Sequence, residues 1–131
     1  FKAYNDAYGH QAGDAVLATV AKCIANCARR TSDLGARYGG EEFSILLPGA
    51  TLPAALETAQ QIRDELTLLR KAQPNLPTLR IGAACMIPGG SFVESDLIRT
   101  ADIALYDAKK SGRDCISFGA DLPSWVDVKA A

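Results

Sequence analysis

The chain has 131 residues, the length of a single domain, and its hydrophobic content of 48% is sufficient for a buried core. Its net charge of −1 excludes a broad basic surface of the kind that binds a nucleic acid polymer, so any phosphate must be bound locally. No stretch is both long enough and apolar enough to cross a membrane, and no secretory signal opens the chain. We therefore expect no membrane contact from this domain.

The four cysteines form no C-x-x-C pair, and with His10 as the only histidine they do not suggest a zinc site. Cys23 and Cys27 lie four residues apart in a helical pattern, which is typical of small core side chains. We therefore expect reduced thiols in a cytoplasmic protein. The chain opens at Phe1 without a methionine, which indicates a piece of a longer protein, such as the cytoplasmic end of a sensor.

The first half of the chain alternates helical and extended patterns. Residues 1–10 suggest a short helical turn and a loop. Apolar side chains at helical spacing then predict a helix from Asp14, which would cap it, to Arg30. Two short strands over 33–38 and 43–47 follow as a hairpin.

The second half predicts four more elements by the same periodicities: a helix over 53–71, a strand over 78–87, a helix over 95–110 and a strand over 115–118. The sequence assigns no role to the tail around Trp125. Interleaved helices and strands predict an α/β (α+β) fold with helices packed on one sheet. A strand ahead of Phe1 would complete a β-α-β-β-α-β pattern of ferredoxin-like type.

Gly39 and Gly40 would form the turn of the hairpin, because glycine supplies the positive φ that a tight primed turn needs. They also leave space for a ligand. Glu41 and Glu42 follow at once and, as neighbours on a strand, should face opposite ways. One carboxylate can then face Mg²⁺, which binds through one or two carboxylates and substrate phosphates. The alternative is a solvated turn whose charges protect a strand edge.

Lys109, Lys110 and Arg113 gather at the end of the last predicted helix, where they can clamp phosphates or complement the helix dipole. Lys109 and Arg113 share a side of the helix if it persists that far. Asn5 and Asp14 pair a carboxamide with a carboxylate, which suits the edge of guanine. Taken alone, these two residues are better explained by turn formation and helix capping.

These motifs occur together in one order. They are Phe1-Lys2-Ala3-Tyr4-Asn5-Asp6, Tyr8-Gly9-His10, Gly13-Asp14, Arg37-Tyr38-Gly39-Gly40-Glu41-Glu42-Phe43, Ala101-Asp102, Tyr106-Asp107-Ala108-Lys109 and Gly112-Arg113. In this order and spacing the chain resembles the GGDEF family of diguanylate cyclases, in the GGEEF variant. The resemblance implies a catalytic domain at 1–118 whose first strand lies upstream, followed by a tail at 119–131. It also implies a nucleotide-cyclase-like, mostly antiparallel sheet with flanking helices.

The resemblance implies that two GTP molecules are joined into cyclic di-GMP with release of two pyrophosphates, in a homodimer whose subunits each hold one GTP. Glu41 and Glu42 would be catalytic, with Glu41 binding Mg²⁺, or Mn²⁺ as the alternative, and Glu42 supporting the site. The implied GTP-binding residues are Lys2, Asn5, Asp14, Gly39, Gly40, Lys109 and Arg113. Of these, Asn5 and Asp14 would contact guanine, and the three basic residues would hold the triphosphate.

The family also has a product-inhibition motif, RxxD, which matches Arg30-Thr31-Ser32-Asp33. Arginine can bind guanine or phosphate bidentately, and the carboxylate can accept from a guanine edge. An inhibitory cyclic di-GMP site at Arg30 and Asp33 is therefore expected. The alternative is an arginine at a helix end and an aspartate at a strand start.

The metal-binding Asp that the family carries four residues before the position of Phe1 lies outside this sequence. A second interpretation is therefore a catalytically silent GGDEF module that binds GTP or cyclic di-GMP as a sensor or dimer partner. A third is another nucleotidyl cyclase of related fold, against which Asp14 argues because it suits guanine.

Overall fold

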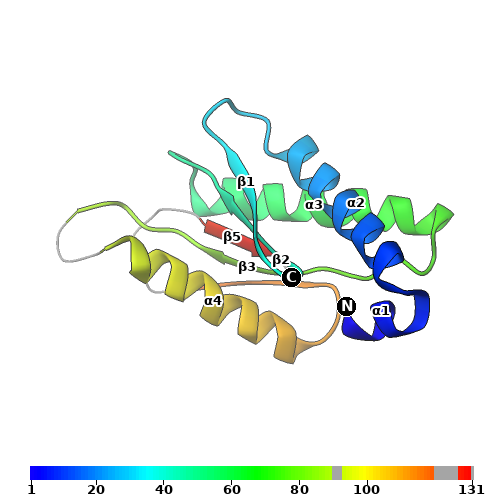
Figure 1. The fold of residues 1–131 in the computed structure, drawn as a ribbon. Coiled ribbons are helices and arrows are strands. Elements are labelled where there is room, and N and C mark those ends of the chain that lie inside the picture. The colour runs from blue at the N-terminus through cyan, green and yellow to red at the C-terminus, as the bar shows by residue number, and fades with distance from the viewer. Residues whose placement is uncertain (90–92, 120–126, 131) are drawn as a thin grey trace.

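The computed structural model describes residues 1–89, 93–119 and 127–130, which form helices packed on both faces of one sheet (Figure 1). The elements in chain order are α1 (Lys2–Tyr8), α2 (His10–Cys27), β1 (Leu34–Gly39), β2 (Glu42–Leu46), α3 (Leu52–Ala72), β3 (Arg80–Ala84), α4 (Glu94–Ser111), β4 (Cys115–Phe118) and β5 (Asp127–Ala130). Helices and strands interleave, which confirms the α/β (α+β) class expected from the sequence.

The strands lie in the order β1-β2-β5-β3-β4. β1 pairs antiparallel with β2, β5 pairs antiparallel with both β2 and β3, and β3 pairs parallel with β4. The sheet is therefore mostly antiparallel, as expected.

The central position of the sheet is taken by β5, from the segment of the tail to which the sequence assigned no role. Val128 pairs with Ile45 on one side and with Ala83 on the other, so β5 joins the hairpin to the second half of the sheet. The strand expected ahead of Phe1 lies outside the sequence, and Trp125 lies outside the described residues.

The two faces of the sheet are covered by different helices, with α2 and α3 on one face and α4 on the other (Figure 1). The alternation of side chains along β3 shows this division. Ile81 and Ala83 are fully buried in the core beneath α2 and α3. Gly82, between them, faces α4, where an added Cβ would overlap the backbone nitrogen of Leu105 and lie 2.5 Å from the carbonyl oxygen of Ala101. The absence of a side chain at Gly82 thus sets the close approach of α4.

The apolar stripes predicted for the first two long helices are confirmed by burial. In α2 the buried side chains recur every three or four residues, and α3 shows the same spacing. The buried residues of these stripes are Val16, Leu17, Val20, Cys23, Ile24, Cys27, Ala55, Ala59, Ile62 and Leu66. Together they make the main core, because both stripes face the same side of the sheet.

The limits of α2 differ from those expected. Gly9 has φ +87°, which ends α1 and lets α2 start at His10, so Asp14 lies inside the helix. The expectation that Asp14 caps this helix is therefore wrong. The helix also ends at Cys27, and Arg30 lies beyond it.

The remaining boundaries are closer to those expected. α3 starts at Leu52, directly after Thr51, whose hydroxyl accepts a hydrogen bond from the backbone N–H of Ala54 (3.3 Å). β4 matches its expected range, whereas the strand expected over 78–87 is shorter and spans Arg80–Ala84.

All four cysteines are free thiols. Burial, together with the neighbouring carboxylate of Glu65, raises the pKa of Cys27 to about 11. The Cys27 thiol donates a weak hydrogen bond to that carboxylate (3.5 Å). Such a thiol is protonated at neutral pH and therefore a poor nucleophile, consistent with a core role. Within the described ranges no helix combines the length and the apolar character needed to span a membrane.

Candidate active site

The hairpin between β1 and β2 presents an open glycine turn. Gly39 pairs with Glu42, and Gly40 and Glu41 form the turn between them. Gly40 has φ +53°, so one of the two glycines supplies the left-handed conformation. The side chain of Arg37 donates a hydrogen bond from Nε to the carbonyl oxygen of Gly40 (2.8 Å), which braces the turn. A Cβ at Gly39 or Gly40 would meet nothing within 4 Å, so the surface above the turn is open.

The two acids of the hairpin have different surroundings. Glu41 is exposed at the turn, where it lines a small cavity together with Phe1 and Arg80. Glu42 is half-buried and forms an ion pair with Lys109 of α4 (Oε1 to Nζ, 3.4 Å). Among the described residues, Glu42 is thus the one of the two acids that is tied to a neighbouring element, and the carboxylate of Glu41 lies at the open end of the hairpin.

The basic residues expected to hold phosphate lie on two elements. Lys109 is in the last turn of α4, where its pairing with Glu42 keeps it beside the hairpin. The helix ends at Ser111 because Gly112 has φ +125°. It therefore stops before Arg113, so Lys109 and Arg113 do not share one side of the helix. Arg113 and Lys2 are both exposed, with Lys2 in the first turn of α1.

Lys110, the third member of the basic cluster, takes a different position. Its ammonium group lies 4.3 Å from the centre of the Tyr106 ring, a cation–π contact on the exposed surface of α4. Its place in the last turn of α4 also agrees with the alternative expected for the cluster, complementation of the helix dipole.

The start of β3, the end of α4 and the N-terminus lie close to the hairpin. Arg80 donates a hydrogen bond from Nε to the carbonyl oxygen of Gly112 (2.9 Å), which fixes the end of α4 to the start of β3. Arg80 also lines the small cavity that contains Phe1 and Glu41. The N-terminus, the hairpin and the end of α4 are therefore gathered at one end of the sheet.

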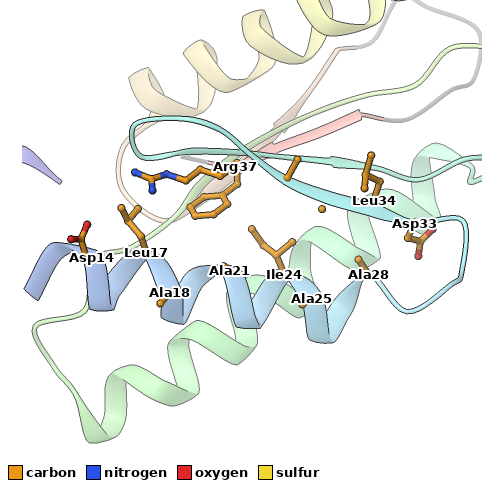
Figure 2. Close-up of a pocket in the computed structure, with 13 residues that line it drawn as sticks. Asp14, Leu17, Ala18, Ala21, Ile24, Ala25, Ala28, Asp33, Leu34 and Arg37 are labelled. Carbon is orange, nitrogen blue, oxygen red and sulfur yellow. The ribbon is translucent and has the colours of Figure 1, made fainter. Parts of the chain in front are cut away.

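A groove of about 650 Å³ lies between α2 and the edge strand β1 (Figure 2). Asp14 and Arg37 stand at one end of it, beside the glycine turn, and Asp33 stands at the other end (Figure 2). Small and apolar side chains of α2 and β1 form the walls between them. The residues that line the groove include Asp14, Leu17, Arg37, Phe43 and Asp33. The carboxylate of Asp14 therefore faces a cavity directly next to the hairpin.

Asn5, the expected partner of Asp14, lies on α1 and is half-buried. Its carboxamide oxygen is buried and has no hydrogen-bond partner among the described residues. It packs against Gly13, the residue that precedes Asp14 in α2. The two residues expected to contact guanine are therefore brought to the junction of α1 and α2.

Arg30 and Asp33 form a compact turn between α2 and β1. The guanidinium donates from Nε to Oδ1 of Asp33 (2.8 Å) and pairs with the same oxygen through Nη2 (2.7 Å). The backbone N–H of Arg30 donates to Oδ2 (3.0 Å). The Asp33 side chain is 5% exposed, whereas that of Arg30 is 48% exposed. The pair therefore offers an accessible guanidinium held in place by a buried carboxylate.

Sequence reasoning assigned no role to Arg37, although it stands two residues before the glycine pair. The structure gives it two, because it braces the turn at Gly40 and lines the groove opposite Asp14. An arginine two residues before a glycine turn was the available signal, but the groove that its side chain lines exists only in the tertiary fold.

The fold and this hairpin define a nucleotide-cyclase-like domain. A family model described as "Diguanylate cyclase, GGDEF domain" matches residues 1–115, and the chain belongs to the GGDEF family. The chain is 38% identical over 120 residues to Diguanylate cyclase A of Treponema denticola, and 39% identical over 114 residues to Diguanylate cyclase DgcM of Escherichia coli (strain K12). These matches cover 89% and 87% of this chain but 32% and 27% of those proteins, so the chain spans about a third of their length or less.

Solved structures show the same fold. The diguanylate cyclase SiaD of Pseudomonas aeruginosa, in complex with its activator SiaC, superposes with a TM-score of 0.69 at 30% identity, over 90% of this chain and 45% of that one. The coiled coil and GGDEF domain of DgcB from Caulobacter crescentus, in complex with c-di-GMP, superposes with a TM-score of 0.67 at 26% identity. That match covers 90% of this chain and 63% of the other.

Proposed function

We propose that this chain is the catalytic part of a diguanylate cyclase, which condenses two GTP molecules into cyclic di-GMP. The observation that carries the proposal is the open GGEEF turn with Asp14 and Arg37 facing a groove directly beside it. Membership of the GGDEF family supports the same function. We propose that it acts in the cytoplasm, where GTP is present.

Guanine recognition is assigned to Asn5 and Asp14. The carboxylate of Asp14 accepts hydrogen bonds from the ring N–H and the exocyclic amine of guanine, a pattern that adenine does not offer. Its position in the groove leaves room for a flat base against the apolar wall that includes Leu17. Asn5 provides the carboxamide at the neighbouring helix junction.

The triphosphate is assigned to Lys2, Lys109 and Arg113. Lys109 is already beside the hairpin through its contact with Glu42 (3.4 Å), and both side chains are partly exposed, so the ion pair is weak enough to be replaced by phosphate contacts. Gly39 and Gly40 present no side chain to obstruct phosphates that lie across the turn.

The exposed carboxylate of Glu41 fits a divalent ion of the Mg²⁺ type. Mg²⁺ takes one or two carboxylates and completes its shell with phosphate oxygens and water, and Glu41 stands beside the open surface where phosphates would lie. When bound, the ion neutralises phosphate charge and lowers the barrier to phosphoryl transfer. Mn²⁺ would suit the same oxygen ligand.

The reaction requires two subunits, because each chain offers one guanine site. The 3′-hydroxyl of each GTP attacks the α-phosphorus of the GTP on the other subunit, forming a P–O bond as the bond to pyrophosphate breaks. The hydroxyl proton leaves with each attack. Two such transfers give one cyclic di-GMP and two pyrophosphates, and the protein contributes mainly by positioning and charge neutralisation.

The function is tested by incubating the full-length protein with GTP and MgCl₂ and separating the products by mass. We expect cyclic di-GMP, with two pyrophosphates released for each molecule formed. A folded, dimeric protein that yields no cyclic di-GMP would overturn the enzyme assignment.

The second candidate function is a catalytically silent GGDEF module, which the accessible guanidinium of Arg30 and the groove at Asp14 would serve without turnover. A silent module would still bind GTP or cyclic di-GMP, as a sensor or dimer partner. Nucleotide binding without product in the experiment above would support this second function.

The Arg30–Asp33 turn is proposed as the inhibitory cyclic di-GMP site. Arg30→Ala is expected to raise the product concentration that gives half-inhibition by about tenfold or more, because hydrogen bonds to a charged group contribute about 1.5–3 kcal/mol. The measurement is the initial rate of synthesis against added cyclic di-GMP.

Arg29→Ala is the matched control for this prediction. Arg29 is an exposed neighbour whose Nε donates to the carbonyl oxygen of Asn26 (2.8 Å) and not to Asp33. We expect its inhibition curve to match that of the wild type. An Arg30→Ala protein with an unchanged curve would remove the inhibitory assignment.

A further inference from the structure

Gly13 occupies a position where glycine is intrinsically unfavourable. It is buried within α2, three residues after the helix begins, and alanine is preferred over glycine in a helix interior. No left-handed conformation explains its presence, because the glycines with positive φ are Gly9, Gly40, Gly49, Gly89 and Gly112 among the described residues. The reason must be the space that a side chain would occupy.

That space is filled by Asn5. A Cβ at Gly13 would overlap Oδ1 of Asn5, lie 2.9 Å from its Cγ and approach Cζ of Phe1 to 3.2 Å. The overlap with Oδ1 is too close for any real Cβ, so Asn5 could not keep this rotamer beside alanine. The carboxamide of Asn5 is therefore seated directly on the backbone of α2.

The backbone of Asn5 is held independently of this contact. Its N–H donates to the carbonyl oxygen of Phe1 (3.0 Å), and its carbonyl oxygen accepts from the N–H of Gly9 (2.8 Å). Only the side chain is then free to change direction. Its buried Oδ1 has no hydrogen-bond partner among the described residues, which is an unfavourable arrangement, and the missing Cβ of Gly13 leaves the room for it.

We propose that Gly13 is a positioning residue for guanine recognition: by lacking a Cβ, it seats the carboxamide of Asn5 at the α1–α2 junction, one residue from Asp14. The proposal rests on the proposed function, since it concerns the same guanine site. It adds a residue that touches no nucleotide but determines where one of the two guanine-reading groups points.

The test is a double-mutant cycle on the full-length protein with Gly13→Ala, Asn5→Ala and both together. The probes are non-hydrolysable analogues of GTP and ATP, and the readout is equilibrium affinity. We expect Gly13→Ala and Asn5→Ala each to weaken binding of the GTP analogue by about tenfold, with little effect on the ATP analogue. The double variant should bind no more weakly than either single variant, because the carboxamide has already been removed.

Thermal stability tests the contact between Gly13 and Asn5 itself, whereas the difference between the GTP and ATP analogues tests its role in guanine recognition. The Asn5→Ala substitution removes the overlap with Oδ1 and leaves the milder contact of the added Cβ with Cζ of Phe1 at 3.2 Å. In that background Gly13→Ala should raise the melting temperature by up to about 2–4 °C through its better helix propensity. In the wild-type background this gain should be absent. Gly13→Ala effects that are equal in both backgrounds, in affinity or in melting temperature, would overturn the proposal.

These measurements distinguish the proposed function from the role of Gly13. A wild-type protein that does not discriminate the GTP analogue from the ATP analogue would remove the proposed function. A wild-type protein that does discriminate, combined with additive losses in the double variant, would remove only the role of Gly13.

Discussion

Replacing Glu41 with glutamine is expected to lower the rate of cyclic di-GMP synthesis by at least about 100-fold. The substitution keeps the shape of the side chain and removes its charge, and Glu41 is the exposed carboxylate at the open turn. Loss of a carboxylate ligand weakens metal-assisted charge neutralisation, and each 1.36 kcal/mol lost from transition-state stabilisation is a factor of ten. The measurement is the initial rate of product formation at saturating GTP across a range of MgCl₂ concentrations.

Glu57→Gln is the matched control for this substitution. Glu57 is an exposed glutamate on α3, outside the candidate site, and the same loss of one charge there should leave the rate unchanged. We also expect Glu41→Gln to retain its melting temperature, because the side chain is exposed. A Glu41→Gln protein with a wild-type rate at every MgCl₂ concentration would show that the metal is not held by this residue.

Replacing Gly82 with alanine is expected to destabilise the fold by about 3 kcal/mol, at the upper end of the range for overpacked cores. An added Cβ would overlap the backbone nitrogen of Leu105 and lie 2.7 Å from its Cα and 2.5 Å from the carbonyl oxygen of Ala101. These are backbone atoms of α4, so no side chain can rotate away. The whole helix would have to move off β3. Urea unfolding measures the effect as a lower transition midpoint with an unchanged slope.

Gly39→Ala provides the control for the glycine substitution itself. Gly39 also lies in a strand, but a Cβ there would meet nothing within 4 Å and its φ is not left-handed. Its stability should change by no more than about 0.5 kcal/mol. Equal transition midpoints for Gly82→Ala and Gly39→Ala would contradict the close packing of α4 on the sheet.

Local patterns in the sequence were sufficient for most of the secondary structure. The spacing of Val16, Val20 and Ile24 predicts the buried face of α2 because a helix repeats every 3.6 residues, and that face is buried. The glycine pair before Glu41 likewise predicts the hairpin, because the turn requires a residue with positive φ. Such rules act over a few residues, so they predict elements without needing the rest of the chain.

The same local rules were misleading where two of them competed. Asp14 follows a glycine and precedes an apolar stripe, which is typical of a helix cap. However, the left-handed conformation of Gly9 separates α1 from α2, and α2 starts at His10, four residues before Asp14. The helix boundary thus depended on the backbone conformation of one glycine, which the spacing of apolar side chains does not report.

By itself, then, the sequence determined the helices, the hairpin and the candidate residues of the GGDEF pattern. Tertiary structure alone decided which of them meet: Glu42 with Lys109, 67 residues away, Asp14 with Arg37 across a groove, and Asn5 with the bare backbone at Gly13. It also placed β5, four residues with no clear local signal, at the centre of the sheet. The physical reason is the same in each case, because pairing between distant segments depends on complementary edges and faces that exist only once the chain has folded.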